Sequence, residues 1–324
     1  MYQYWLVTAA NRKAELRETS NEVKPKQGEV SVEIQYTTMN YKDALAILGK
    51  PGVIRKYALV PGIDFSGIVT KSEHEDFKAG DEVFTNGFGV GESKHGGFAT
   101  QQIFCGDDIM HKPKNLSLKQ LMQAGTAGYT AGLCLYDILQ MGITPKDGPL
   151  FVSGATGGVG MFAVALAAAA GFDVTAISRK HEDDMLKRLG AKHILTTEQF
   201  GIEERPLGKE MMAAAIDCVG GDILSSFLAR TKPEGVVAAC GLAQSARLTT
   251  SVVPFILRGV KLLGINSVNQ PKEKRAKVWE LISKLDFEKF EGYFTDIELI
   301  EAQDAATKLL SGAHKGRFII DMSR

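Results

Sequence analysis

Residues 153–160 read Ser-Gly-Ala-Thr-Gly-Gly-Val-Gly, a run with four glycines that lies between two segments of different character. The apolar segment 149–152 before the run is typical of a strand, and the Ala-rich segment 161–170 after it is typical of a helix. A strand, a Gly-rich turn and a helix in this order predict the phosphate-binding corner of a dinucleotide fold.

The glycines of this turn each have a physical reason to be there. Gly154 permits the tight turn, Gly157 lets the backbone approach a pyrophosphate, and Gly160 lets the helix pack closely on the strand. The start of the helix then offers unpaired N–H groups and partial positive charge to the phosphates. We therefore expect cofactor contacts from Thr156, Gly157, Gly158, Val159 and Gly160.

The next predicted strand, 172–177, ends on Ser178, Arg179 and Lys180. NAD-binding folds place an Asp or Glu here for the ribose 2′-hydroxyl, whereas a hydroxyl and two cations attract a 2′-phosphate. We predict NADP(H) as the cofactor, with these three residues at the 2′-phosphate. The alternative is that the two cations are solvated loop charges.

Length and composition place the chain among ordinary globular proteins. Its 324 residues suffice for two domains, and 44% of them are hydrophobic and 23% charged. The formal net charge of zero gives no support for nucleic-acid or membrane binding. The longest apolar run, 159–172, is too short to span a membrane, and the N-terminus lacks a signal-peptide pattern, so we expect a cytoplasmic protein.

The four cysteines, Cys105, Cys134, Cys218 and Cys240, are widely spaced and form no Cys-x-x-Cys pair. This spacing argues against a disulfide framework and against a zinc knuckle. We expect the cysteines to be small buried apolar residues.

The pattern of the chain changes near residue 117. Before it, the alternating segment 29–36 and short β-like runs at 67–69 and 81–84, separated by turn signals, predict a β-barrel-like domain. After it, strands and helices alternate, which predicts a parallel, doubly wound sheet. The expected helices are one that starts after Ser117, then 130–140, 159–170, 183–189, 222–229 and 272–285. The expected strands are 150–152, 172–177, 193–196, 214–218, 235–239, 261–265 and 317–320.

Five segments carry a resemblance to a known superfamily. They are Met39-Asn40-Tyr41-Lys42-Asp43-Ala44, Pro61-Gly62-Ile63-Asp64-Phe65-Ser66-Gly67, Gly87-Phe88-Gly89-Val90-Gly91-Glu92, Gly125-Thr126-Ala127-Gly128 and Val253-Pro254-Phe255-Ile256-Leu257-Arg258. With them the chain resembles the medium-chain dehydrogenase/reductase superfamily over essentially its whole length. It is most similar to the zinc-free quinone-oxidoreductase branch of the YhdH/YhfP family, which includes NADPH-dependent acrylyl-CoA reductases.

The resemblance implies an α/β fold with two domains. A GroES-like β-barrel catalytic domain would comprise 1–120 and 266–324, and a Rossmann NADP(H)-binding domain with a doubly wound parallel sheet would comprise 121–265. Relatives commonly form homodimers, so a homodimer is expected.

The zinc alcohol dehydrogenases of this superfamily hold their catalytic metal with a Cys, a His and a second Cys. Here the corresponding segments read Asn40-Tyr41-Lys42-Asp43, Gly62-Ile63-Asp64 and Gly125-Thr126, and the four closely spaced cysteines of the structural zinc lobe are missing. Zinc needs several deprotonated N or S ligands, so we expect no metal. Without a Lewis acid, hydride transfer to an already electrophilic C=C bond is favoured over alcohol or aldehyde chemistry.

The position of the family's metal site supplies three catalytic candidates. Tyr41 is expected to present its hydroxyl to substrate or cofactor, and its alternative is a packed core tyrosine. Asn40 either hydrogen-bonds the substrate carbonyl or holds the local turn. Asp64 is expected to orient its neighbours through hydrogen bonds rather than to act as a base.

Further cofactor contacts follow from the resemblance and from the carboxyl ends of the predicted strands, which face the ligand crevice in such sheets. Gly241 and Leu242 are expected beside the cofactor, and Asn266 and Ser267 near the nicotinamide. Arg205 is either a second cation for the 2′-phosphate or a purely structural residue.

Three functions stay open on this reasoning. The first is an NADPH-dependent reductase of an activated C=C bond in an enoyl thioester, most specifically acrylyl-CoA to propionyl-CoA. The second is an NADPH:quinone oxidoreductase, and the third is a non-catalytic NADPH-binding protein. Each takes small-molecule ligands and no nucleic acid or membrane.

Overall fold

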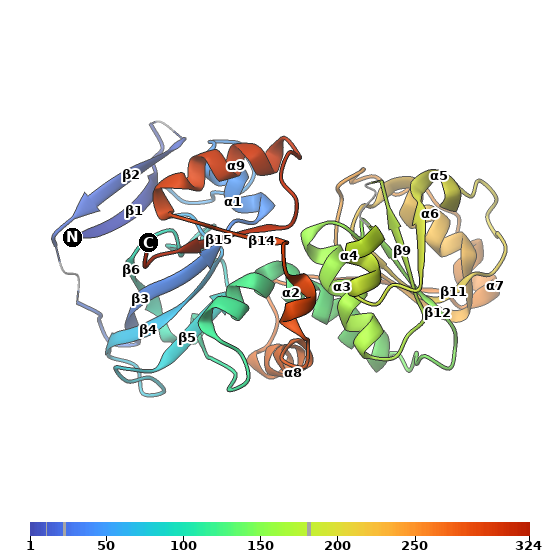
Figure 1. Ribbon diagram of the computed structural model, residues 1–324, viewed down its shortest axis with the longest axis horizontal. Coiled ribbons are helices and arrows are strands. Elements are labelled where there is room, and N and C mark those ends of the chain that lie inside the picture. Colours follow the sequence, from blue (N-terminus) through green and yellow to red (C-terminus); the bar gives the residue numbers. More distant parts are fainter. Residues whose placement is uncertain (11, 22–23, 180–182) are drawn as a thin grey trace. The chain divides into compact units, whose positions relative to one another are not determined.

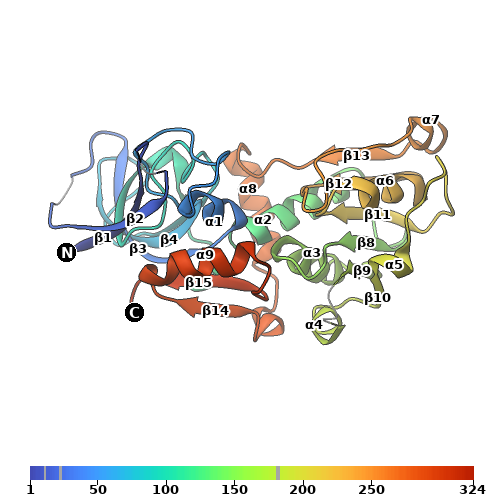
Figure 2. The ribbon, with the colours of Figure 1, turned by 90° about the horizontal axis from the view of Figure 1, so that it is seen from above.

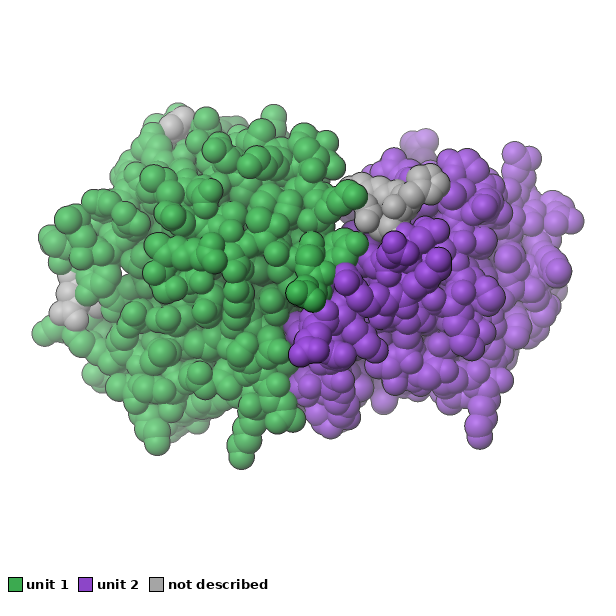
Figure 3. All heavy atoms as spheres, in the orientation of Figure 1, with its two compact units in different colours: residues 1–126, 268–272, 291–324 green, residues 127–267, 273–290 purple. Residues whose placement is uncertain are grey.

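The computed structural model describes residues 1–10, 12–21, 24–179 and 183–324. The chain divides into two compact units, which are coloured separately in Figure 3. Unit 1 comprises 1–126, 268–272 and 291–324, and unit 2 comprises 127–267 and 273–290. These units are a geometric description, and the domain limits expected from the sequence remain a proposal.

Unit 1 is built mainly from strands. Its helices are α1 (Tyr41–Ile47), α9 (Ala302–Leu310) and the 3₁₀ turns Gly106–Asp108 and Leu299–Glu301. Its strands are β1 (Tyr2–Val7), β2 (Ala14–Thr19), β3 (Glu29–Thr38), β4 (Asp64–Ser72), β5 (Glu82–Asn86), β6 (Gln101–Cys105), β7 (Met110–His111), β14 (Phe294–Ile297) and β15 (Arg317–Asp321).

The main sheet of unit 1 joins distant parts of the chain. Within the described residues its order is β14-β15-β3-β4-β5-β7, with β6 also paired to β3, and β1 and β2 form a separate hairpin. β15 pairs antiparallel with β3, which brings the C-terminal strand beside residues 36–38. Figure 1 shows the late helix α9 next to the early helix α1. The buried core includes the stacked rings of Phe65 and Phe104, whose centroids are 3.9 Å apart.

Unit 2 alternates strands and helices as the sequence predicts. Its helices are α3 (Gly158–Ala169), α4 (Asp183–Arg188), α5 (Thr197–Phe200), α6 (Gly221–Arg230), α7 (Val253–Arg258), α8 (Lys272–Ile282) and the 3₁₀ turn Phe287–Phe290, and α2 (Leu118–Gln140) runs into it from unit 1. Its strands are β8 (Leu150–Ser153), β9 (Val174–Ser178), β10 (His193–Thr196), β11 (Met212–Asp217), β12 (Thr231–Ala239) and β13 (Lys261–Gly264).

The strands of unit 2 form one parallel sheet in the order β10-β9-β8-β11-β12-β13. Figure 2 shows them side by side, with β10 and β13 at the two edges. Counted from β8, this is the order 3-2-1-4-5-6 of a Rossmann fold, whose strand order reverses between β8 and β11. The predicted fold class, a GroES-like domain with a Rossmann domain, is confirmed.

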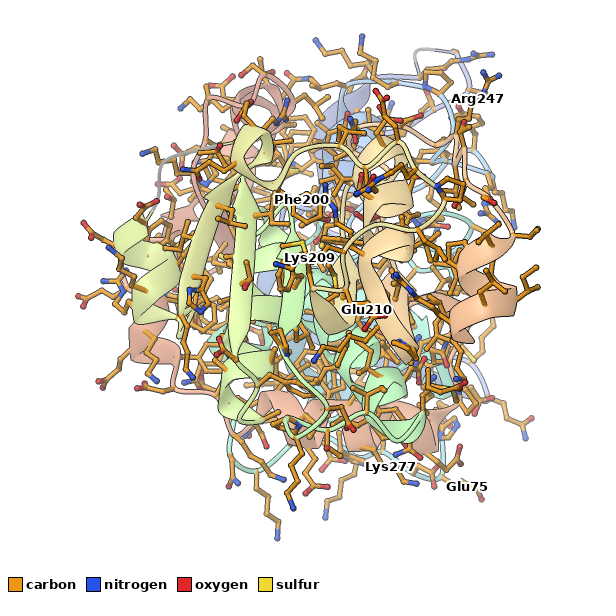
Figure 4. The ribbon with its side chains drawn as sticks, turned by 90° about the vertical axis from the view of Figure 1, so that its right-hand side faces the viewer. Glu75, Phe200, Lys209, Glu210, Arg247 and Lys277 are labelled. Atoms are coloured by element: carbon orange, nitrogen blue, oxygen red, sulfur yellow. The ribbon has the colours of Figure 1, made fainter. Side chains whose placement is uncertain are left out.

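The core of unit 2 explains why its sequence is so apolar. α3 is buried over most of its length, and its small alanines let it lie close to the sheet. Phe200, which is labelled in Figure 4, is 4% exposed. The guanidinium of Arg230 lies 4.6 Å from the centroid of its ring. Among the described residues, no helix has both the length and the apolar character required to cross a membrane.

Helix α2 contains a break at Gly125, where φ is 51° and ψ is −155°. The sequence predicts two helices here with glycines between them, and the non-helical backbone of Gly125 does separate α2 into two helical segments. Ser117 accepts a hydrogen bond from the Gln120 amide at 3.1 Å, as expected for a residue that caps the helix start. The N-terminal hairpin and α1 were not expected, because neither segment has a strong apolar period.

Candidate functional site

The Gly-rich turn of unit 2 has the conformation that a phosphate-binding corner needs. Gly154 has a φ of +59°, and Gly157 is the residue that precedes α3. A Cβ atom on Gly160 would overlap the carbonyl oxygen of Gly154. The start of α3 therefore lies closer to the turn than a residue with a side chain would permit. This cradle, with the free N–H groups of the first turn of α3, fits a pyrophosphate.

Hydrogen bonds tie this turn to the end of β11. Ser153 Oγ donates to Asp217 Oδ1 at 2.7 Å, and the Cys218 amide donates to Ser153 Oγ at 3.0 Å. The Gly220 amide donates to Asp217 Oδ2 at 2.7 Å. Burial raises the pKa of Asp217, although these hydrogen bonds oppose the shift. The carboxyl ends of β8 and β11 are therefore held together where the strand order reverses, which is where ligands bind in such sheets.

Ser178 is the last residue of β9 and Arg179 follows it, while their contact with a 2′-phosphate stays a prediction. The hydroxyls of Thr156 and Ser178 are 2.9 Å apart, which links the Gly-rich turn to the end of β9. Arg179 follows directly and is exposed, and no ion pair with another described residue occupies its guanidinium. Lys180 lies outside the described residues. The cation that the structure describes at this strand end is thus available to a phosphate.

Arg205 has a local partner. Its Nε and Nη2 donate to the two carboxylate oxygens of Glu203 at 2.9 and 3.2 Å, and this pairing lowers the pKa of Glu203 to about 2. The Glu203 amide in turn donates to Ser226 Oγ in α6 at 2.9 Å. These contacts support the structural alternative for Arg205, while its role at the 2′-phosphate stays a prediction.

The remaining cofactor candidates follow β12 and β13. A Cβ on Gly241 would overlap the carbonyl oxygen of Cys218, so the segment after β12 lies directly against the end of β11. The side chain of Leu242 is 67% exposed. Asn266 and Ser267 follow β13, and Ser267 O accepts a hydrogen bond from Arg275 Nη2 at 3.1 Å.

In unit 1, the Asp64 carboxylate is fully buried and is the centre of a polar cluster. It accepts hydrogen bonds from Asn40 Nδ2 at 2.8 Å, the Thr126 amide at 2.7 Å and Thr126 Oγ1 at 2.5 Å. Burial raises the pKa of Asp64, and these hydrogen bonds and the charge of Arg317 counteract the shift. A carboxylate saturated in this way fixes its neighbours, which agrees with the orienting role expected for it.

Asn40 connects this carboxylate with a second one. Its backbone amide and Nδ2 donate to Asp43 Oδ2 at 2.9 and 3.1 Å, and the Ile63 amide donates to Asp43 Oδ1 at 2.9 Å. Burial, followed by repulsion from Asp64, raises the pKa of Asp43 to about 7. Because Asn40 Nδ2 has only two N–H groups and both carboxylates use them, a bond to a substrate carbonyl would require one of these bonds to break. The observed contacts support the role of Asn40 in holding the turn.

Arg317 supplies the positive charge of the cluster. Its side chain is 5% exposed, and its Nη2 donates to Thr38 Oγ1 at 3.0 Å and to Asn40 Oδ1 at 3.4 Å. Burial lowers the pKa of Arg317, whereas the two nearby carboxylates raise it. The cluster holds one cation and two carboxyl groups.

Tyr41 begins α1 directly after Asn40, and its side chain is 64% exposed. The alternative that Tyr41 is a packed core residue is therefore wrong, because the first turn of this short helix points the side chain away from the protein interior. Its hydroxyl is reachable by a ligand, and its catalytic role stays a prediction.

Sequence reasoning missed Asp43, Thr126 and Arg317 as members of this cluster. One signal was present for Arg317, which directly precedes the apolar run 318–320 and so requires a counter-charge if it is buried. The other two have ordinary sequence surroundings, and they become recognisable only once β4 and the kink at Gly125 bring them to Asp64.

The cysteines differ from the expectation that all four are buried. Cys134 is buried, Cys218 and Cys240 are partly accessible, and Cys105 is exposed at the end of β6. The reason is that Cys218 and Cys240 follow the carboxyl ends of strands, where the sheet opens towards solvent. Within the described part of the chain, no group of three or more His, Cys, Asp and Glu side chains could hold a metal ion.

The sequence matches two protein-family models. Residues 26–114 match the alcohol dehydrogenase GroES-like domain, and residues 158–284 match the family described as zinc-binding dehydrogenase.

Relatives of high similarity extend over nearly the whole chain. A protein of Escherichia coli (strain K12) named probable acrylyl-CoA reductase AcuI is 42% identical over 94% of this chain and 95% of its own length. The putative quinone oxidoreductase YhfP of Bacillus subtilis (strain 168) is 39% identical over 94% of this chain and 93% of its own length. The crystal structure of the yhdH oxidoreductase from Salmonella enterica in complex with NADP matches with a TM-score of 0.93 and 40% identity, covering 99% of this chain and 100% of that one.

Proposed function

The chain belongs to the YhdH/YhfP branch of the medium-chain dehydrogenase/reductase superfamily, and from that premise we propose that it is an NADPH-dependent enoyl thioester reductase. Its most specific reaction is the reduction of acrylyl-CoA by NADPH and a proton to propionyl-CoA and NADP⁺. The observation that carries this proposal is the 42% identity, over 94% of the chain, to a protein named probable acrylyl-CoA reductase.

NADP(H) is the cofactor, and unit 2 has the residues to hold it. Gly157, Gly160 and the first turn of α3 receive the pyrophosphate, while Ser178 and Arg179 receive the 2′-phosphate. When bound, NADPH supplies the hydride. The Thr156–Ser178 contact aligns the two phosphate-binding segments before the cofactor arrives.

In unit 1, the polar cluster fixes the start of α1 and thereby the residue that follows Asn40. Tyr41 donates a hydrogen bond from its exposed hydroxyl to the thioester oxygen, where negative charge develops during hydride transfer. Replacement of Tyr41 by Phe is expected to lower kcat by roughly 10²-fold with an unchanged Kd for NADPH, as for the loss of one oxyanion donor. Tyr57→Phe, which changes another partly exposed tyrosine of unit 1, is the matched control.

An acceptor panel tests the function. Oxidation of NADPH is followed by the loss of the absorbance of its reduced nicotinamide, with acrylyl-CoA, crotonyl-CoA and simple quinones as acceptors. We expect acrylyl-CoA to have the highest kcat/KM and propionyl-CoA to be the product. Turnover of quinones alone would replace the proposal by its alternative.

That alternative is an NADPH:quinone oxidoreductase, and it rests on the 39% identity to a putative quinone oxidoreductase. It uses the same hydride step on a flat, apolar acceptor. Tight NADPH binding without consumption of any acceptor would instead indicate a non-catalytic NADPH-binding protein.

A homodimer is the assembly that the surface of unit 2 favours. β13 is an edge strand of the parallel sheet, and the neighbouring α7 exposes Ile256 and Leu257 by 72% and 67%. Open edges and clustered apolar side chains are features that proteins cover by association. Light scattering is expected to give the mass of two chains for the wild type and of one chain for Leu257→Asp. A monomeric wild type at micromolar concentration would contradict the dimer.

The proposed enzyme acts in the cytoplasm on small molecules. The formal net charge of zero gives no electrostatic basis for binding nucleic acid or an anionic membrane surface. Fractionation of cells that produce the tagged protein tests the location, and recovery of the protein with membranes would contradict it.

A further inference from the structure

Two cysteines lie side by side at the carboxyl edge of the parallel sheet. Asp217 and Ala239 are paired in the register of β11 and β12, so the residues that follow them, Cys218 and Cys240, are adjacent. Their sulfur atoms are 3.9 Å apart, and both side chains are partly accessible to solvent. Neighbouring strands lie about 4.8 Å apart, which is within the Cα–Cα range of roughly 4.4–6.8 Å that a disulfide requires.

The two thiols interact with each other and with a third thiol, Cys134. Hydrogen bonds from Cys134 and Cys218 lower the pKa of Cys240, whereas the hydrogen bond with Cys240, together with burial, raises the pKa of Cys218. Cys134, which is fully buried on α2, has its pKa raised by burial. The other titratable groups that act on these thiols are Asp217 and Asp137. A thiolate is the reactive form of cysteine, and either thiol of the pair can supply it.

The pair also lies against the Gly-rich turn. A Cβ on Gly154 would be 3.4 Å from Cys218 Cβ, and the Cys218 amide donates to Ser153 Oγ at 3.0 Å. Gly241, the residue after the second cysteine, packs directly on the carbonyl group of Cys218. A change in the covalent state of the two sulfurs would therefore act on the Gly-rich turn 153–160 and the segments packed against it, which we call the cofactor corner.

We propose that Cys218 and Cys240 form a reversible oxidation site for hydrogen peroxide, which bound NADP(H) shields and whose disulfide form has a weakened affinity for NADP(H). The thiolate of one cysteine attacks one peroxide oxygen, which gives a sulfenic acid and hydroxide. The sulfur of the other cysteine then attacks the sulfenic sulfur, and water leaves as the S–S bond forms. In total two thiols are oxidised to one disulfide and one peroxide is reduced to two waters.

The weakened affinity follows from the movement that the bond requires. The two sulfurs must approach each other from 3.9 Å to about 2.05 Å. Gly241 packs directly on the Cys218 carbonyl group and the Cys218 amide is bonded to Ser153 Oγ, so a change in the conformation of Cys218 acts on the backbone of the cofactor corner. The shielding and affinity parts rest on the proposed cofactor function, whereas formation of the disulfide does not.

The test uses the full-length protein treated with hydrogen peroxide, followed by peptide mapping and by fluorescence titration with NADPH. We expect a Cys218–Cys240 cross-link, a Kd for NADPH at least about 10-fold higher, and recovery of both thiols and affinity with dithiothreitol. Saturating NADP⁺ should slow formation of the cross-link at least about 10-fold. Cys240→Ser should abolish the cross-link, and Cys105→Ser, which changes the exposed cysteine of unit 1, should leave it unchanged.

The outcomes separate this inference from the proposed function. Two free thiols after oxidation, or a cross-link of Cys240 to Cys134, would overturn the oxidation site even if NADPH binds normally. A cross-link that forms equally fast with and without bound NADP⁺, or that leaves the Kd unchanged, would overturn its coupling to the cofactor corner. Failure of the reduced protein to bind NADPH would instead contradict the cofactor function while the disulfide result still stands.

Discussion

The cofactor corner of unit 2 and the polar cluster of unit 1 are built on opposite principles. The corner consists of backbone: glycines without side chains, free N–H groups at the start of α3, and an exposed Arg179. The cluster consists of buried side chains, in which Asp43, Asp64 and Arg317 are held by hydrogen bonds within the protein. The corner is prepared to receive charge from outside, while the cluster balances its own charge internally.

This difference predicts different consequences of mutation. Changes in the corner should lower ligand affinity more than they lower folding stability. Changes in the cluster should alter folding stability first, because a buried charge loses its partner. Four substitutions test this division, two in each region.

Replacement of Arg317 by Met should have the largest effect. It leaves two carboxyl groups buried without their cation, and the free energy of unfolding should fall by about 3–5 kcal/mol. Urea denaturation measures it, with Arg247→Met at an exposed position of unit 2 as the control that should change stability by less than about 0.5 kcal/mol (Figure 4). Addition of Asp64→Asn to Arg317→Met should restore part of the loss, and a purely additive double mutant would contradict the charge balance.

Gly160→Ala should have the largest effect on the cofactor. A Cβ at this position overlaps the carbonyl of Gly154, so α3 must move away from the turn. We expect the Kd for NADPH to rise by about 100-fold, or about 2.7 kcal/mol, in a fluorescence titration. Gly264→Ala, whose Cβ would meet no atom within 4 Å, is the matched control. An unchanged Kd for Gly160→Ala would separate the turn from the cofactor site.

Arg179→Ala should weaken NADPH binding by about 10- to 100-fold and NADH binding much less, because a charge-assisted contact contributes about 1.5–3 kcal/mol. Arg205→Ala is the informative companion, since Arg205 is paired with Glu203. It should leave the preference between the two cofactors unchanged. Equal losses for NADPH and NADH in Arg179→Ala would exclude the 2′-phosphate as its ligand.

Asp43 should give the smallest effect, visible in the pH dependence of stability. Its pKa of about 7 in the folded protein exceeds the ordinary value of 3.8, so the folded state retains a proton that the unfolded state has released. The resulting stabilisation is present below the unfolded pKa and is lost as the pH rises through 7. Relative to that of Asp43→Asn, the free energy of unfolding of the wild type should therefore fall by on the order of 1–2 kcal/mol between pH 5.5 and 7.5.

Chemical denaturation at several pH values measures this difference. Above pH 8 the free energies of unfolding of the two proteins should differ by a constant amount, because Asp43 of the wild type is then ionised in both the folded and the unfolded states. The exposed Asp107, with a side chain that is 81% accessible, supplies the control variant Asp107→Asn. A constant difference between wild type and Asp43→Asn over this range would show that Asp43 does not titrate there.

The corner could be predicted from sequence because its determinants are local. The strand, turn and helix of 150–170 are contiguous, and β10 lies at the residues 193–196 that the pattern predicts. The cluster could not be assembled in this way, because residues 43, 64, 126 and 317 meet only through the pairing of β15 with β3 and through the kink in α2. Sequence patterns indicate which residues form a strand but do not give the register that joins distant strands.

The exposure of Tyr41 illustrates the same limit. Its position after Asn40 was evident, but whether it points inward or outward depends on α1, a helix of seven residues that has no strong apolar period. Arg205 is the reverse case, because its partner Glu203 is only two residues away and could have been considered from the sequence.

The kink at Gly125 makes Asp64 the N-terminal cap of a helix to which it does not belong. The break releases the Thr126 amide from the ladder of α2, and the carboxylate 62 residues earlier in the chain accepts it. A negative charge at this point also interacts favourably with the dipole of the helical segment that starts there. A Cβ on Gly125 would lie 2.6 Å from Asp64 Oδ2. A residue other than glycine at position 125 would therefore displace the Asp64 carboxylate and leave the first turn after the kink without its cap.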